Sequence, residues 1–138
     1  MPIFETNQDR INEEEVVKLF ANKSGYSYNK LDDFDLDFVL IDNQGRKVCY
    51  LEIKCYNTMS DQFRTAMHSV YKYEKLMKYD KKLPTFFVCR YKDDVVHYIR
   101  AKDIKGEIRI SGRKNPRPNA YRDRERCIFI DRKLFKTL

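Results

Sequence analysis

Four charged side chains, Asp35, Asp37, Glu52 and Lys54, lie at even spacings within residues 34–55, in stretches that are otherwise apolar. Side chains alternate between the two faces of a strand, so Asp35 and Asp37 share one face, and Glu52 and Lys54 share another. Between the two apolar stretches, residues 42–45 have the sequence DNQG, which is typical of a turn. The pattern therefore predicts a hairpin that sets two charged strands side by side.

This hairpin would bring Asp37 level with Glu52, or close to it. Two like charges in that position are destabilising unless a cation lies between them. Carboxylate, carbonyl and water oxygens are the ligands that Mg²⁺ and Mn²⁺ favour. Lys54 would project to the same point, where an ammonium group can stabilise charge on a phosphate or help to activate water. The alternative is an ordinary solvated face with cross-strand ion pairs, which short patterns of this kind also match.

The elements that position these residues follow from hydrophobic periodicity. Residues 9–23 carry an apolar stripe of helical period that ends at Ser24-Gly25, and residues 60–81 return to a helical period. Apolar runs bounded by turn residues predict five strands, at residues 26–31, 34–41, 46–56, 85–91 and 95–101. This order, α-β-β-β-α-β-β, indicates an α/β domain around one mixed central sheet.

The last part of the chain, about residues 106–138, is rich in arginine and proline. It predicts a strand near residues 107–110, a basic loop to about residue 125, a strand at residues 127–130 and a terminal turn. Pro116 and Pro118 exclude a helix or a central strand from the loop. We interpret this extension as a phosphate-binding arm, with a solubilising loop as the alternative. Its candidate contacts are Arg113, Lys114, Arg117 and Arg122.

Length and composition limit the possible classes of protein. The chain has 138 residues, a formal net charge of +7 and a pI near 9.2. We expect one domain, and the basic charge favours a polyanionic partner, nucleic acid first and an acidic membrane surface second. No window of about 18 apolar residues predicts a membrane span, and the N-terminus shows no secretion signal.

The cysteines and histidines do not predict a zinc site. The four cysteines are far apart in the sequence and form no C-x-x-C pair, and only two histidines accompany them. Cysteines in apolar strands are usually reduced core residues, so we expect a cytoplasmic protein.

The acids and the lysine together resemble the signature of the PD-(D/E)XK nuclease superfamily. Its core runs helix, three strands, helix, strand, with an acid at the start of one strand and (D/E)-x-K in the next. The segment LDFVLI supplies Asp37, and LEIKC supplies Glu52 and Lys54. Asp35 competes for the first position, but the family's acid is usually followed at once by the apolar run. The resemblance covers roughly residues 9–100, has Leu36 where the family often has proline, and implies a restriction-endonuclease-like core.

The resemblance also implies a metal site and a fourth acid. Asp37, Glu52 and the carbonyl of Ile53 would hold Mg²⁺, for which Mn²⁺ can substitute, together with a glutamate of the first helix. The segment INEEEVVKLFANKSGY resembles the opening helix of the Holliday-junction-resolvase branch. In this chain three consecutive glutamates, Glu13, Glu14 and Glu15, compete for the position of the fourth acid. Glu13 points within the arc of the apolar face and is the glutamate that we predict for the site, whereas counting back from the glycine selects Glu14. The alternative is an acidic first turn that the helix dipole stabilises, which would explain all three glutamates without a role in the site.

Residues 59–99 resemble the second half of small phage-type nucleases. On the predicted helix, Lys72 and Lys75 are candidates for phosphate contacts, although a solvated helix face would also carry them. Gln62 is a candidate partner of the metal site or a capping residue, and we expect His68 at the surface or its boundary.

The sequence thus predicts a metal-dependent endonuclease that hydrolyses phosphodiester bonds in DNA, with branched or Holliday-junction DNA as the leading substrate and single-stranded DNA as another. Two symmetric cuts need two sites, which favours a homodimer. The alternatives are a nucleic-acid-binding module on the same fold that no longer cuts, and a protein-interaction module. The complete set of acids and lysine favours the nuclease.

Overall fold

A six-stranded mixed sheet and a three-stranded antiparallel sheet form the framework of the computed structural model, which describes residues 7–32, 36–112 and 124–138. In chain order the helices and strands are α1 (Asn7–Ser24), β1 (Ser27–Lys30), β2 (Phe38–Ile41), β3 (Lys47–Cys55), β4 (Thr65–Ser69), α2 (Val70–Asp80), β5 (Thr85–Arg90), β6 (Val96–Arg100), β7 (Gly106–Gly112), β8 (Arg124–Asp131) and β9 (Lys136–Thr137). Among the described residues, no helix is long and apolar enough to span a membrane.

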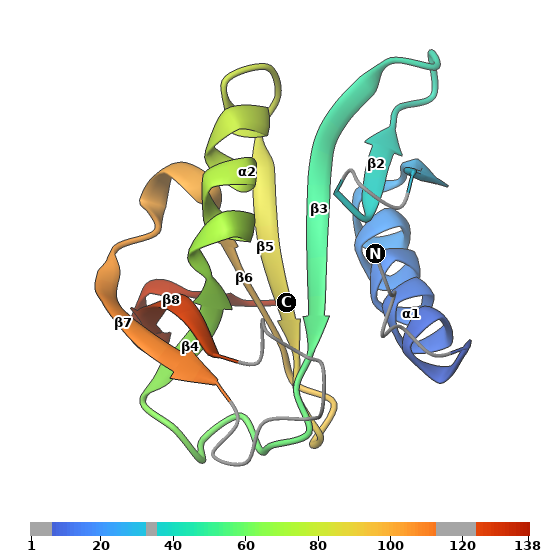
Figure 1. Ribbon diagram of the computed structural model, residues 1–138. Coiled ribbons are helices and arrows are strands. Elements are labelled where there is room, and N and C mark those ends of the chain that lie inside the picture. Colours follow the sequence, from blue (N-terminus) through green and yellow to red (C-terminus); the bar gives the residue numbers. More distant parts are fainter. Residues whose placement is uncertain (1–6, 33–35, 113–123) are drawn as a thin grey trace.

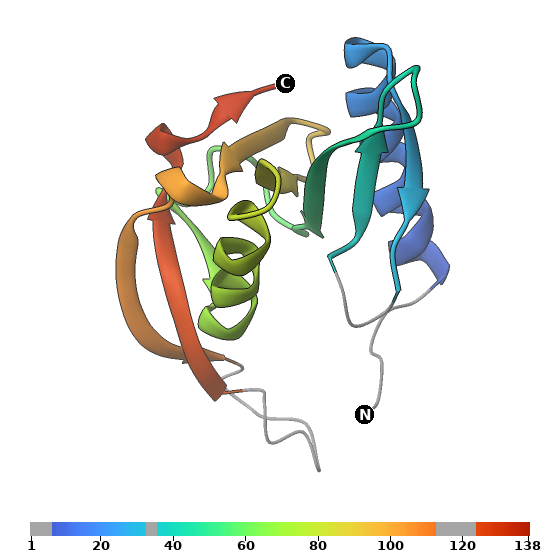
Figure 2. The ribbon, with the colours of Figure 1, turned by 90° about the horizontal axis from the view of Figure 1, so that it is seen from above.

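The six-stranded sheet has the order β1-β2-β3-β5-β6-β9, and its strands pair antiparallel except for the central pair β3 and β5, which is parallel. α1 and α2 lie on opposite sides of the sheet (Figures 1 and 2). Val16 and Val17 of α1 pack with Leu51 and Ile53 on one face. On the other face, Leu76 of α2 belongs to a cluster that includes residues of β5, β6 and β8. The helices and six-stranded sheet confirm the predicted mixed α/β core.

The predicted hairpin between β2 and β3 is present, and its turn is built by Asp42. The Oδ1 atom of Asp42 accepts hydrogen bonds from the backbone N–H groups of Gln44 and Arg46, each at 2.9 Å. Gly45 has a φ of +79°, a left-handed conformation that costs glycine little. These local interactions fix the turn, and the pairing of the two strands then shifts by one residue between Leu40 and Ile41.

The three-stranded sheet, in the order β4-β8-β7, was not predicted. Residues 65–69 form its edge strand β4, so the prediction of one helix over residues 60–81 is wrong in its first part, and only Val70–Asp80 is helical. Ala66 and His68 alternate with more exposed neighbours, as a strand requires, and pair with β8 from the end of the chain. Ser69 then caps α2 by accepting a hydrogen bond from the N–H of Lys72 at 3.2 Å.

Gly106 of β7 lies against the backbone of β8, and it provides a test of this sheet. A Cβ atom at this position would lie 2.1 Å from the carbonyl oxygen of Phe129, a backbone atom that cannot rotate away. We expect Gly106→Ala to lower the free energy of unfolding by about 2 kcal/mol, measured by urea denaturation. The exposed neighbour Lys105 is the control, because Lys105→Ala should change it by less than about 0.5 kcal/mol. Equal effects of the two substitutions would contradict the placement of β7.

Candidate active site

Asp37 and Glu52 are brought together by the register of the β2–β3 hairpin. Phe38 lies opposite Leu51 and Val39 opposite Tyr50, so the next position outward sets Asp37 beside Glu52. The carboxylate of Asp37 turns towards β3, where its Oδ2 atom accepts a hydrogen bond from the backbone N–H of Ile53 at 2.7 Å. The first acid is therefore attached directly to the strand that carries Glu52 and Lys54.

Glu52 is buried, with 6% of its surface exposed, and its charge is costly there. Burial and the negative charge of Asp37 raise the pKa of Glu52 to about 7, although Lys72 and Lys75 act in the opposite direction. The Nζ atom of Lys72 lies 3.7 Å from Oε1 of Glu52. Glu52 thus faces cations of α2 and lies beside the negative charge of Asp37, an arrangement in which a further cation would be stabilised.

Lys54 lies two residues from Glu52 on the same face of β3, and its ammonium group points towards β4. Its Nζ atom donates a hydrogen bond to the backbone carbonyl of Met67 at 3.2 Å and lies 4.9 Å from the centroid of the Tyr56 ring. Burial, followed by the positive charge of Lys72, lowers the pKa of Lys54. The ammonium group of Lys54 is therefore held against the three-stranded sheet, whereas Asp37 is bonded to β3 beside Lys30 and Glu52 is paired with Lys72 of α2.

Of the three consecutive glutamates, Glu13 is the one that α1 directs towards Asp37. The Nζ atom of Lys30 lies 4.0 Å from Oε2 of Glu13 and 3.9 Å from Oδ1 of Asp37, so one ammonium group lies between the two acids. Glu14 instead accepts a hydrogen bond from the Tyr28 hydroxyl at 3.0 Å. Glu15 turns away and forms an ion pair with an arginine of β5.

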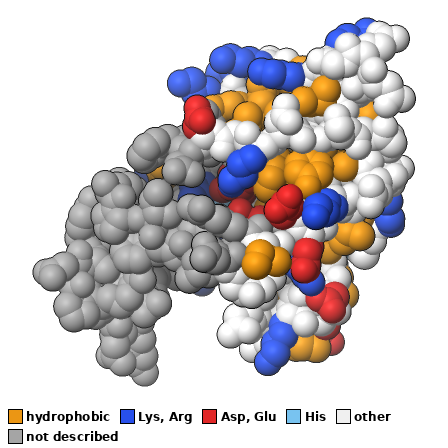
Figure 3. All heavy atoms as spheres, turned by 90° about the vertical axis from the view of Figure 1, so that its right-hand side faces the viewer, with side chains coloured by type: hydrophobic (Ala, Val, Ile, Leu, Met, Phe, Trp, Pro, Cys, Tyr) orange, Lys and Arg blue, Asp and Glu red, His pale blue; other side chains and the backbone are white. Residues whose placement is uncertain are grey.

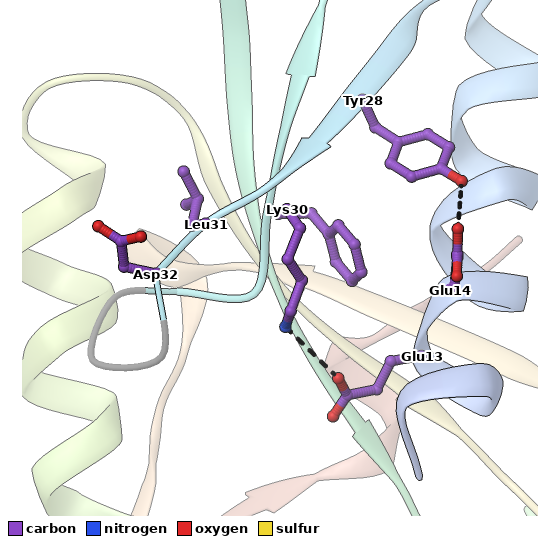
Figure 4. A pocket seen from close by; sticks show the side chains of 7 residues that line it. Glu13, Glu14, Tyr28, Lys30, Leu31 and Asp32 are labelled. Atoms are coloured by element: carbon purple, nitrogen blue, oxygen red, sulfur yellow. Dashed lines mark hydrogen bonds and ion pairs between the residues drawn. The ribbon is translucent and has the colours of Figure 1, made fainter. Parts of the chain in front are cut away.

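A pocket of about 450 Å³ opens between α1 and β1 beside this lysine. Figure 4 shows Lys30 reaching across it to Glu13, while Tyr28 and Glu14 meet on its far side. On the α1 side of the molecule, acidic and basic side chains are intermingled around hydrophobic ones (Figure 3). The pocket therefore carries charges of both signs.

The donor set fits a hard divalent cation only in part. Within residues 7–32, 36–112 and 124–138 there is no cluster of three or more His, Cys, Asp or Glu side chains that could hold a metal ion. Two adjacent carboxylates, Asp37 and Glu52, flank the backbone of Ile53, and such oxygen donors suit Mg²⁺, which keeps several waters. Glu13 is connected to this pair through Lys30 and not by sharing a common position with it.

Comparison with known proteins identifies the family and the fold of this chain. A family model described as "Phage putative PDDEXK endonuclease" matches residues 1–138. The chain belongs to this family of PD-(D/E)XK endonucleases. Among solved structures, the chain is similar to Hjc of Archaeoglobus fulgidus, a Holliday junction resolvase, with a TM-score of 0.58 and 14% identity over 94% of this chain and 87% of that one. No curated protein matches the chain in sequence. The family and the restriction-endonuclease-like fold expected from the sequence are both confirmed.

The other candidate residues that the sequence predicted for this PD-(D/E)XK chain lie in different parts of the structure. Lys72 and Lys75 lie on α2 and act on Glu52. Gln62 lies in the loop before β4, where its side chain accepts a hydrogen bond from the N–H of Met59 at 3.2 Å, so its local role is that of a turn cap. Candidates outside the described residues are Asp35, Arg113, Lys114, Arg117 and Arg122.

Sequence reasoning missed three residues of the site, namely Lys30, Tyr56 and His68. His68, expected near the surface, is 2% exposed and stacks on Phe87 with ring centroids 4.1 Å apart. Burial, followed by the charges of Lys54 and Lys72, lowers the pKa of His68 well below its usual value. Its alternation with Ala66 in a short β-type pattern was the available signal, hidden by the longer helical period that follows.

The ion pair between α2 and Glu52 gives a direct test of the electrostatics. Replacing Lys72 with glutamine removes the nearest cation, so the pKa of Glu52 should rise above its wild-type value. The measurement is a carboxyl ¹³C NMR titration of Glu52. Lys78→Gln on the same helix is the matched control and should leave the pKa of Glu52 unchanged. A titration of Glu52 that is the same in both variants would contradict the ion pair.

Proposed function

We propose that this chain is a metal-dependent endonuclease that hydrolyses phosphodiester bonds in DNA. The observation that carries the proposal is the meeting of Asp37 with the Glu52–Lys54 strand, within a chain of the PD-(D/E)XK endonuclease family. Two acids and a lysine on neighbouring strands supply the groups that such hydrolysis needs.

The proposed cofactor is Mg²⁺, with Mn²⁺ as a substitute. Asp37, Glu52 and the carbonyl of Ile53 would hold it, with Glu13 as the further acid, and bound metal supplies Lewis-acid stabilisation of phosphate charge. Lys54 places an ammonium group two residues from Glu52, where it can stabilise charge on the phosphate or orient water. Lys30 and Lys72 neutralise the acids from either side of the hairpin.

The proposed substrate is DNA, and branched DNA is the leading form. The net charge of +7 favours a polyanion, and the similar fold of Hjc, a Holliday junction resolvase, favours a branched substrate. Cutting a junction symmetrically would need a homodimer. The arm residues Arg113, Lys114, Arg117 and Arg122, with Lys72 and Lys75 on α2, are the proposed phosphate contacts, and the proposed place of action is the cytoplasm of the host cell.

The test uses the whole chain with four DNA substrates: supercoiled plasmid, linear duplex, single strands and a synthetic four-way junction. Each is incubated with Mg²⁺, with Mn²⁺ or with EDTA, beside Glu52→Ala and Lys54→Ala. We expect wild type to cut only with a divalent metal, to prefer the junction, and to lose activity in both variants. Ser60→Ala, outside the site, is the control that should still cut.

The possible results separate the candidate functions. Binding to the junction without cutting would favour a nucleic-acid-binding module on the same fold. Cutting in EDTA, or cutting that survives both substitutions, would overturn the proposed mechanism. Equal cutting of all four substrates would retain the nuclease and remove the preference for branched DNA.

A further inference from the structure

Lys54 belongs to β3 of the six-stranded sheet, but its side chain forms a hydrogen bond with the three-stranded sheet. Its ammonium group donates to the carbonyl of Met67, which lies on β4 of the three-stranded sheet. The position of that carbonyl depends on the pairing of Met67 with Phe129 of β8, contributed by the end of the chain. The location of the Lys54 ammonium is thus set by a contact between the two sheets.

Tyr56 strengthens the same contact. Its hydroxyl donates a hydrogen bond to the Met67 carbonyl at 2.6 Å, so this oxygen accepts two hydrogen bonds, the number that its lone pairs allow. The Tyr56 ring lies 4.9 Å from Nζ of Lys54, within the range of a cation–π interaction. The ring also stacks with Tyr91 at 5.3 Å and 14°, which fixes its orientation.

His68, the residue after Met67, packs β4 against the six-stranded sheet. His68 is buried and stacks on Phe87 of β5, and among the described contacts its Nε2 atom has no hydrogen-bond partner. Its stacking on Phe87 packs β4 against β5 next to the Met67 carbonyl that accepts the hydrogen bond from Lys54. A lysine with four rotatable side-chain bonds is otherwise free to move, so holding it in one place needs several contacts.

We propose that Tyr56, together with the backbone carbonyl of Met67, positions the ammonium group of Lys54 for phosphodiester cutting, so that the three-stranded sheet is part of the active site. Tyr56 is a positioning residue, because it acts through Lys54 and not on DNA. The proposal rests on the function proposed above, in which Lys54 takes part in cutting.

The test compares Tyr56→Phe, which keeps the ring and removes the hydroxyl, with Tyr56→Leu, which removes both. The first readout is the NMR spectrum of lysine-labelled full-length protein, with the Lys54 side-chain signals assigned by their loss in Lys54→Met. We expect an upfield ring-current shift of these signals in wild type and in Tyr56→Phe, and its loss in Tyr56→Leu. The second readout is junction cutting, where kcat of Tyr56→Leu should fall about tenfold at unchanged KM.

Tyr50→Leu is the matched control, because Tyr50 lies on the same face of β3 but packs its ring against Tyr79, 5.0 Å away. It should lose stability as Tyr56→Leu does, measured by thermal unfolding, while keeping the Lys54 shift and kcat. Wild-type protein without an upfield Lys54 signal, or Tyr56→Leu with wild-type kcat, would overturn the proposal. A wild-type chain that cuts no DNA refutes the proposed function, and the NMR signal then decides by itself whether the contact exists.

Discussion

Glutamine in place of Glu52 is expected to raise the free energy of unfolding by about 2 kcal/mol at about pH 8, while abolishing DNA cutting. The buried Glu52 carboxylate has a pKa of about 7, against its ordinary value of 4.5. Glutamine has nearly the same shape and carries no charge, so the variant avoids the cost of ionising this position. The raised pKa already includes the opposing attraction of Lys72, so the expected gain is net of that ion pair.

The pH dependence of this effect has a definite sign. Because the pKa of Glu52 is raised on folding, the folded state binds more protons than the unfolded state between pH 4.5 and about 7. The contribution of Glu52 to stability is therefore present at low pH and is lost as the pH rises through that window. The difference between Glu52→Gln and wild type should be near zero at pH 4.5, grow up to about pH 7 and stay constant above it.

His68 changes the stability with pH in the direction opposite to Glu52, over much of the same pH range. Its pKa is lowered well below 6.5 on folding, so its contribution is present above that value and is lost as the pH falls. In wild type the contributions of Glu52 and His68 to the pH dependence of the free energy of unfolding partly cancel. In Glu52→Gln, the free energy of unfolding should therefore rise visibly with pH towards 6.5. Urea denaturation of metal-free protein across the range measures both curves. Glu74→Gln, on the exposed face of α2, is the control. A gain in the free energy of unfolding of Glu52→Gln that does not change with pH would refute the raised pKa of Glu52.

Asp37→Asn and Lys54→Met are expected to separate metal binding from cutting. The asparagine keeps a side-chain carbonyl that can accept from the N–H of Ile53, but it loses the charge that a cation needs. We expect Asp37→Asn to lose measurable Mn²⁺ binding and to cut DNA roughly 10³-fold more slowly. Lys54→Met should bind Mn²⁺ at least as well as wild type, since a nearby positive charge is removed, yet cutting should fall roughly 10³-fold.

Isothermal titration with Mn²⁺ and nicking of supercoiled plasmid measure the two effects. Asp32→Asn, which removes an exposed acid near the pocket, is the control for a change in net charge. The pKa of Glu52 should also fall in Asp37→Asn, because the charge of Asp37 helps to raise it. Unchanged Mn²⁺ binding in Asp37→Asn would refute the placement of the metal, and normal cutting by Lys54→Met would refute the role of the lysine.

The amino-acid sequence alone determined the elements that depend on local interactions. The stripe of apolar residues predicted α1, and the turn residues 42–45 predicted the β2–β3 hairpin, which the structure contains. The turn sets β2 beside β3, whereas the exact position of Asp37 beside Glu52 depends on a one-residue shift of the pairing between Leu40 and Ile41, which the turn does not specify. The predicted strands at residues 85–91 and 95–101 correspond to β5 and β6.

Tertiary structure decided what depends on partners that are distant in the sequence. Thr65–Ser69 is a strand because β8, about sixty residues away, pairs with it, and the short alternation around Ala66 and His68 is weaker than the helical period that follows. The burial of His68, the hydrogen bond of Lys54 to the Met67 carbonyl and the position of Lys30 between Glu13 and Asp37 all follow from such long-range packing. Side-chain types and spacing thus predicted the candidate residues Asp37, Glu52 and Lys54, whereas contacts between separate elements decided where each charge is held.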